Sequence, residues 1–199
     1  MALAVAAMAS MRLAGLGLLH TQARADSAEL LARRSAQVVK VLSEPNGLAE
    51  IVAVQSALLL GPRALPVDAA AALAALDDAS VAAHAPFRAF AGDALASGAA
   101  TFASQQAAIA SRVDHRETLR ALRGLPICVV TGEYDGVTPP AVAKELHALS
   151  SDAPWRSLTV ISDVGHLSPL EDPGALLRAL EPWLATVDEA ERKRRESPP

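Results

Sequence analysis

Aromatic residues and cysteines are scarce in this sequence, and both shortages narrow the possible folds. Only 3% of the 199 residues are aromatic, although 51% are hydrophobic. Much of the apolar content is therefore alanine, which favours helices and buries little area per residue. The single cysteine, Cys128, excludes an intrachain disulfide and a metal site built from cysteines. Its position inside an apolar run predicts a small buried residue.

The sequence also has no excess of positive charge and no long apolar segment. The formal net charge is −4, so no basic field indicates nucleic-acid binding. Basic residues cluster only at 192–195, between Glu191 and Glu196, which predicts a disordered, solvated tail over 188–199. No apolar run reaches the roughly 18–20 residues that a membrane-spanning helix needs. We therefore expect neither a nucleic-acid partner nor a membrane span.

The first 25 residues resemble a secretory signal peptide in some respects. They are largely apolar and end in the small-residue sequence Ala23-Arg24-Ala25. However, no basic residue precedes the apolar stretch, Arg12 interrupts it, and Gly15 to Leu19 fits a buried strand. The expected location is therefore cytoplasmic, with secretion as the alternative if residues 1–25 act as a signal.

Three apolar runs have the character of strands that are buried on both faces. They lie at about Arg12–Leu19, Ile127–Thr131 and Leu158–Ile161, and segments with helical spacing separate them. Strands of this kind are typical of parallel sheets covered by helices. The sequence therefore predicts an α/β fold with about three parallel strands and flanking helices.

Residues 21 to 110 have the apolar spacing of a helical region without a strand of its own. Asp26, with Glu29 three residues later, predicts a helix start with Asp26 as the N-cap. A break is expected at residues 77–80, and Pro86 is expected to interrupt the helix that follows. Pro182 is similarly expected to kink or break the last helix of the chain.

An acid and a histidine follow the last two predicted strands. Asp135 stands three residues after Gly132, and His166 comes directly after Gly165, 31 residues further on. This separation matches one strand–helix–strand unit, so both side chains belong at the same edge of a parallel sheet. Asp135 can orient a histidine that acts as a general base, while an Asx turn is its alternative role. Glu133 is a competing candidate for the acid.

These motifs resemble the C-terminal part of an α/β-hydrolase. The matching features are G-x-x-D after a buried strand, Thr138-Pro139-Pro140 opening a helix with Thr138 as its N-cap, and G-H-L-x-x-L-E-x-P from Gly165 to Pro173. The resemblance implies that Asp135 and His166 are the acid and base of a catalytic triad. It also implies a partial hydrolase core at 1–20 and 111–187 and a helical lid at 21–110. Neither a cofactor nor a metal is implied.

The nucleophile expected by this resemblance has no counterpart in the sequence. Neither G-x-S-x-G nor G-x-D-x-G occurs, so the resemblance implies a chain truncated after the nucleophile elbow. Serine, as in esterases, or aspartate, as in dehalogenase-like relatives, remains open as the nucleophile. We expect hydrolysis of carboxylic-ester-type bonds in a complete family member and an inactive chain on its own.

The surroundings of the site predict its partners only in outline. The apolar composition of 21–110 favours a small apolar ester-like substrate. The strand at 12–19 lacks a predicted neighbour on one side, which would leave an apolar edge open to self-association. The alternative function is a non-catalytic binding or scaffold protein derived from a hydrolase.

Overall fold

One half of the molecule is built around a parallel sheet, which has three strands within the described residues. The computed structural model describes residues 2–76 and 84–196. The strand order is β1 (Leu16–Leu19), β2 (Ile127–Gly132) and β3 (Arg156–Ile161), all parallel. Ile127 lies opposite Leu16 on one side and opposite Arg156 on the other. The predicted α/β fold with three parallel strands is therefore confirmed.

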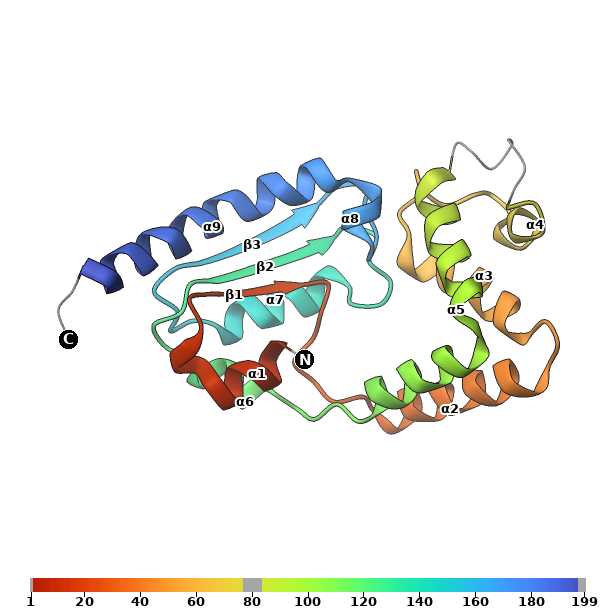
Figure 1. Ribbon diagram of the computed structural model, residues 1–199, viewed down its shortest axis with the longest axis horizontal. Coiled ribbons are helices and arrows are strands. Elements are labelled where there is room, and N and C mark those ends of the chain that lie inside the picture. Colours follow the sequence, from red (N-terminus) through yellow and green to blue (C-terminus); the bar gives the residue numbers. More distant parts are fainter. Residues whose placement is uncertain (1, 77–83, 197–199) are drawn as a thin grey trace.

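Helices cover both faces of this sheet (Figure 1). One face packs against α9 (Pro173–Glu196), which contacts β2 and β3. The other face packs against α7 (Pro140–Leu149), with α6 (Arg116–Ala121) and α1 (Ala2–Ala9) beside it. Two short helices complete this part, η1 (Ser10–Arg12) and α8 (Ser168–Glu171).

The side chains of β2 divide between two cores. Ile127 and Val129 join the cluster that includes α1, α6 and α7, while Cys128 and Val130 join the cluster under α9. All four are at most 1% exposed, as expected of a central parallel strand. Cys128 is buried, as predicted, and burial raises the pKa of its thiol.

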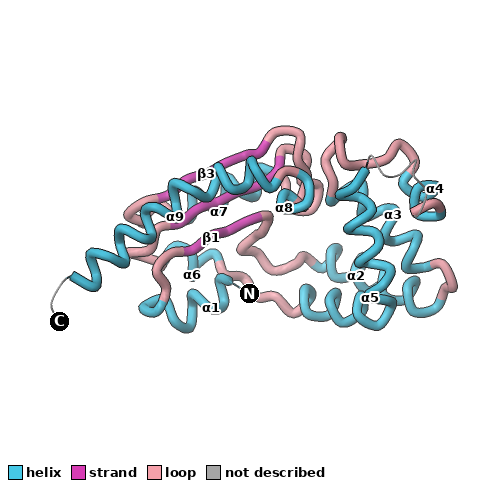
Figure 2. The backbone as a smooth tube through the Cα atoms, turned by 45° about the horizontal axis from the view of Figure 1, so that its top comes forward, coloured by secondary structure: helices cyan, strands magenta, loops and turns pink. Residues whose placement is uncertain are grey.

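A second group of helices forms a lobe of its own. This helical lobe consists of α2 (Ala28–Ser43), α3 (Gly47–Leu59), α4 (Ala69–Ala74) and α5 (Ala85–Ala110). Its main core surrounds Val52, Phe87 and Ala91. Figure 2 shows the lobe beyond the end of the sheet at which α8 lies. The break predicted at 77–80 lies outside the described residues.

Two details of the helical lobe differ from the sequence-based expectation. Pro86 lies in the first turn of α5, where proline is tolerated because the N–H it lacks would have no helical partner. The interruption comes instead at Gly98, whose φ of 78° is not helical. The N-cap of α2 is Ser27, which accepts a hydrogen bond from the Leu30 N–H, because Asp26 is engaged by two arginines.

The C-terminal helix α9 is longer than the sequence indicates. It continues through Pro182, which is exposed, and it is held beyond that point by Trp183, whose Nε1 donates to the Pro126 carbonyl oxygen at 3.0 Å. Residues 188–196 are helical, where a disordered tail was expected. Ion pairs one turn apart, such as Arg192 with Glu189, stabilise them.

The outer edge of β1 has no strand partner among the described residues. Leu16 and His20 donate their backbone N–H groups to Pro126 and Val130 on the β2 side. Successive N–H groups alternate in direction, so those of Gly17 and Leu19 point to the open edge. Self-association through this edge remains a prediction. No helix within residues 2–76 and 84–196 has the length and apolarity to cross a membrane.

Candidate active site

The loops that follow the three strands bring together two histidines and an aspartate. His20 is the first residue after β1, Asp135 lies in the loop after β2, and His166 lies in the loop after β3. Parallel strands end at the same edge of a sheet, and ligands commonly bind there. The structure thus places Asp135 and His166 next to each other, as their spacing predicts, and it adds His20.

Asp135 lies at the centre of a dense set of hydrogen bonds. Its side chain is fully buried, and Oδ1 accepts the backbone N–H groups of Val137 at 2.9 Å and Thr138 at 2.7 Å. Its Oδ2 accepts the Thr138 hydroxyl at 3.0 Å and faces Nδ1 of His166 and of His20. Burial raises the pKa of this carboxyl. The hydrogen bonds from His166, His20 and Thr138 outweigh that effect and hold the pKa well below its ordinary value.

Asp135 both forms an Asx-type turn and orients a histidine, so the two roles predicted for it coexist in the structure. The bonds to the N–H groups of Val137 and Thr138 make an Asx-type turn, and the same carboxylate also meets His166. Thr138 therefore serves Asp135, while Pro139 occupies the N-cap position of α7 that Thr138 was expected to hold. The competing acid, Glu133, instead accepts the backbone N–H of Asp163 at 3.1 Å.

The depressed pKa of Asp135 predicts a specific loss of stability in acid. A carboxyl whose folded pKa lies below its unfolded value of about 3.9 stabilises the fold above that pH and loses this effect as the pH falls further. We expect Asp135→Asn to lower the free energy of unfolding by about 2 kcal/mol at pH 5, because its amide cannot accept all these donors. Urea unfolding should show this difference shrinking by pH 3.

A suitable control for this experiment is Asp188→Asn. Asp188 is exposed on α9 and makes no ion pair with a described residue. Its replacement should leave the stability at both pH values within about 0.5 kcal/mol of the parent. A difference between Asp135→Asn and the parent that stays constant from pH 5 to pH 3 would contradict a low pKa for Asp135.

His166 is fixed by its backbone and by one of its ring nitrogens. Nδ1 lies 2.9 Å from Asp135 Oδ2, and the backbone N–H donates to the Leu59 carbonyl oxygen at 2.7 Å. An ionised carboxylate only accepts, so Nδ1 carries the proton and Nε2 keeps a lone pair. Nε2 makes no hydrogen bond within the described part of the chain, and the side chain is 21% exposed. It is therefore placed to take a proton from a ligand.

Glu171 ties the His166 loop to the helical lobe. Its carboxylate accepts the backbone N–H groups of Gly61 at 2.6 Å, Gly165 at 3.0 Å and Leu167 at 3.2 Å. Gly61 lies just after the end of α3, whereas Gly165 and Leu167 flank His166. One side chain thus joins the segment after α3 to the loop that carries the candidate base.

His20 is a site residue whose role the sequence does not reveal. Its side chain is 7% exposed, and its ring nitrogens lie 3.0 Å from Asp135 Oδ2 and 2.7 Å from Ser168 Oγ. Its φ of 46° is unusual for a residue other than glycine and turns the chain at the end of β1. The only signal in the sequence is its position directly after a predicted strand. His20 lies outside the motifs that contain Asp135 and His166.

Ser168, His20 and Asp135 form a serine–histidine–aspartate chain of hydrogen bonds beside the pair of Asp135 and His166. The Ser168 hydroxyl is within 2.7 Å of His20 Nε2, but Ser168 is 0% exposed. A nucleophile has to meet its substrate at about 3 Å, which full burial prevents. Ser168 therefore acts here as a buried partner that holds His20 in place.

The three site residues also have the spacing of possible metal ligands. One donor atom from each of His20, Asp135 and His166 lies within 4.8 Å of the others. Both Nδ1 atoms, however, lie at hydrogen-bond distance from the same carboxylate oxygen. The contacts present are those of a hydrogen-bonded network, and no metal ligand set is assigned.

A cavity of about 310 Å³ opens beside this network, between the strand ends and the helical lobe. His20, Thr138 and His166 line it on the sheet side, and residues of α2, α3 and α5 line it on the other. This volume lies at the lower end of the range for small-molecule sites. The candidate site is therefore a cavity bordered by His166, the candidate base.

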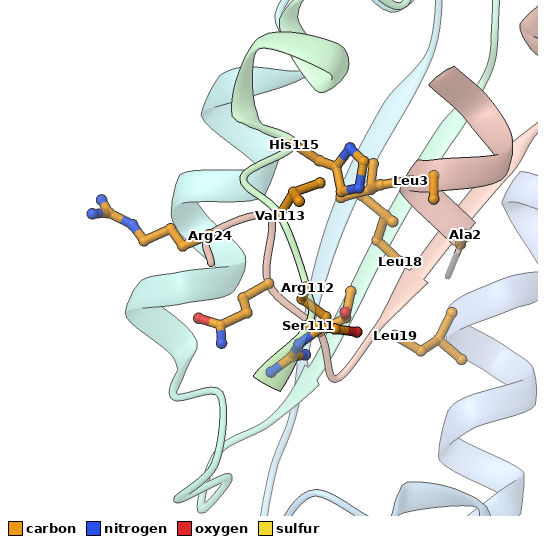
Figure 3. A pocket seen from close by; sticks show the side chains of 13 residues that line it. Ala2, Leu3, Leu18, Leu19, Arg24, Ser111, Arg112, Val113 and His115 are labelled. Carbon is orange, nitrogen blue, oxygen red and sulfur yellow. The ribbon is translucent and has the colours of Figure 1, made fainter. Parts of the chain in front are cut away.

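A larger cavity, of about 400 Å³, lies nearer the N-terminus and does not contain His166. Figure 3 shows Leu3, Leu18 and His115 gathered around it, with Arg112 at its lower end. Arg112 also lines the cavity at His166, so the two spaces are neighbours. The candidate site is assigned to the smaller cavity because the hydrogen-bonded acid and base are there.

The chain is similar in structure to several solved proteins with the α/β-hydrolase fold. A thermophilic esterase from Thermogutta terrifontis, solved with malate bound, matches with a TM-score of 0.72 and 27% identity over 94% of this chain. The enol-lactonase from Burkholderia xenovorans LB400 matches with 0.68 and 20% identity over 92%, and MenH from S. aureus with 0.66 and 18% identity over 94%.

These matches involve only part of each relative. This chain covers 61% of the esterase, 61% of the lactonase and 64% of MenH. No family model matches the sequence, and no curated protein matches it either. The likeness therefore establishes the fold, and activity has to be argued from the site.

Proposed function

We propose, since this chain has the fold of the C-terminal part of an α/β-hydrolase, that it supplies the base and the orienting acid of ester hydrolysis. The observation that carries the proposal is the 2.9 Å contact between Asp135 Oδ2 and His166 Nδ1. This contact leaves the other ring nitrogen of His166 free to act beside a cavity. Geometry of this kind suits acyl transfer, in which one imidazole first takes and then returns a proton.

The proposed reaction gives His166 the proton transfers and Asp135 the stabilisation of the protonated imidazole. A hydroxyl attacks the ester carbonyl while His166 Nε2 takes its proton, and Asp135 stabilises the resulting imidazolium. His166 then gives that proton to the departing alcohol, and water completes the cycle with the same base. With an aspartate nucleophile, His166 would activate the water of the second step only.

These 199 residues contain no recognisable motif that supplies the attacking group. They contain neither G-x-S-x-G nor G-x-D-x-G, and the Ser168 hydroxyl is fully buried. We therefore expect no hydrolysis by this chain alone. The same absence supports the second candidate function, a hydrolase-derived binding protein without catalysis.

The test begins with the DNA immediately 5′ of the Met1 codon. An in-frame sequence encoding G-x-S-x-G or G-x-D-x-G is expected, and the longer product should hydrolyse p-nitrophenyl butyrate. The 199-residue chain should release p-nitrophenol no faster than buffer does. If this chain hydrolysed the ester and the Ser168→Ala variant did not, the proposal would be contradicted. Ser168 would then be the nucleophile. No encoded elbow and no activity would favour the binding protein.

A further inference from the structure

One wall of the cavity at His166 is polar, which the predicted apolar ester does not account for. Its wall on the side of the helical lobe carries three arginines and three glutamines, and none of the described residues that line the cavity is acidic. These residues are Arg33, Arg34, Gln37, Gln55, Gln106 and Arg112. Guanidinium and amide groups at a small-molecule site fix polar parts of a ligand.

The positive charges of this wall are only partly balanced. The fully buried carboxylate of Asp26 pairs with Arg34 at 2.5 Å and with Arg112 at 3.2 Å, so two cations share one anion. Arg33 makes no ion pair with any described residue, and it is exposed at the border of the cavity. Arg34 and Arg112 thus share one carboxylate, and Arg33 is the arginine of this wall without an ion-pair partner among the described residues.

We propose that this cavity selects esters that carry a second, ionised carboxylate, and that Arg33 binds that carboxylate. This inference rests on the proposed function, because it assigns the substrate class of the same site. The single charge of the unpaired Arg33 guanidinium matches that of a carboxylate better than the nearly double charge of a phosphate. Arg33 offers a planar fork of donors that fits a carboxylate.

The surrounding contacts explain why Arg33, of the three arginines, is free to bind a ligand. Asp26 and the Gln106 side-chain oxygen already hold Arg34, the latter at 2.7 Å. Arg112 donates to Asp26 and to the Ile109 carbonyl oxygen. Arg34 and Arg112 therefore shape the wall, whereas the Arg33 guanidinium can turn toward a ligand without breaking an ion pair.

The experiment compares two probes of similar length on the 199-residue chain. Monomethyl glutarate carries one ester and one carboxylate, and dimethyl glutarate is its neutral counterpart. Binding is followed by the ring resonances of His166, so it does not depend on hydrolysis. We expect the charged probe to bind about tenfold more tightly, in the range of a hydrogen bond to a charged group. Equal affinities would overturn the proposal.

Three variants assign the preference to Arg33. Arg33→Gln should remove most of the tenfold difference, and Arg33→Lys should keep part of it because the charge remains. Arg88→Gln is the matched control, since Arg88 is exposed on α5, lies outside the cavity and makes no ion pair with a described residue. A preference that survives Arg33→Gln unchanged would also overturn the proposal.

The outcome is independent of the proposed catalytic role. If binding shows no charge preference while His166 proves essential for hydrolysis, only the substrate class is wrong. If the preference depends on Arg33 while hydrolysis by the longer product does not need His166, only the catalytic assignment is wrong.

Discussion

Replacing His166 by alanine is expected to lower kcat/KM for ester hydrolysis by about 10⁴- to 10⁶-fold in a form of the protein that supplies a nucleophile. The loss is large because the imidazole both takes the proton of the attacking group and returns it to the leaving group. The KM should change little, since the cavity keeps its other lining residues. Steady-state kinetics with p-nitrophenyl butyrate measures both constants.

Two further variants make this result specific. His147→Ala removes a histidine in the last turn of α7, near the start of β3 and away from the carboxyl ends of the strands, and it should leave kcat/KM within about twofold of the parent. Ser168→Ala removes the hydroxyl that holds His20 and should cost much less than His166→Ala. If Ser168→Ala abolished activity and His166→Ala did not, the base would be His20 and the assignment would be reversed.

The parts of the site that the sequence predicts are those set by short stretches of chain. Asp135 and His166 each follow a strand within a few residues, and parallel strands fix the edge at which such residues meet. His20 contacts Asp135 across 115 residues of sequence. No local pattern marks that contact, because the residue after β1 reaches the acid only once β1 and β2 are paired.

The differences at Asp26 and Thr138 have the same physical origin. Each has the side chain and the position of a helix N-cap, which is a local interaction worth about 1 kcal/mol. In the fold, the Asp26 carboxylate forms ion pairs with Arg34 and Arg112, and the Thr138 hydroxyl donates a hydrogen bond to Asp135. Tertiary partners of opposite charge, or a buried carboxylate that needs donors, outweigh a local cap. Thr138 therefore belongs to the site, and Asp26 supports the arginines of its cavity wall.

The expected polarity of the cavity also depended on tertiary placement. The composition of 21–110 is apolar overall, which favoured an apolar substrate. The helices bury their apolar faces against one another around Val52 and Phe87. That packing directs polar side chains, among them Arg33 and Gln55, to the cavity. Composition describes the whole lobe, whereas recognition depends on the few residues that face the ligand.

Gly132→Ala is expected to have the largest effect on stability. A Cβ at this position would lie 2.1 Å from the Gly165 carbonyl oxygen and 2.3 Å from that of Val164. Both atoms belong to the backbone of the loop that carries His166, so relief requires moving that loop. We expect a loss of about 3 kcal/mol and a Tm lower by roughly 6–12 °C, measured by circular dichroism.

The same substitution at Gly92 provides the matched control. Gly92 lies within α5, and a Cβ added there would meet no neighbouring atom within 4 Å. Alanine at this position should therefore raise stability by about 0.5–1 kcal/mol. Equal effects of the two changes would show that the approach of the β2 and β3 loops does not constrain the fold.

The loop movement forced by Gly132→Ala also links stability to the chemistry. The Tyr134 N–H donates to the Val164 carbonyl oxygen at 2.9 Å, so the Asp135 and His166 loops are joined beside Gly132. Separating them should lengthen the contact between Asp135 and His166 Nδ1. In ¹⁵N spectra of the folded variant, His166 should then lose its preference for the tautomer protonated at Nδ1. A destabilised variant that kept that tautomer would show that the approach of Gly132 to the 164–165 backbone is not needed to hold the acid and base together. The contacts of Glu171 and Leu59 with the His166 loop would then be sufficient.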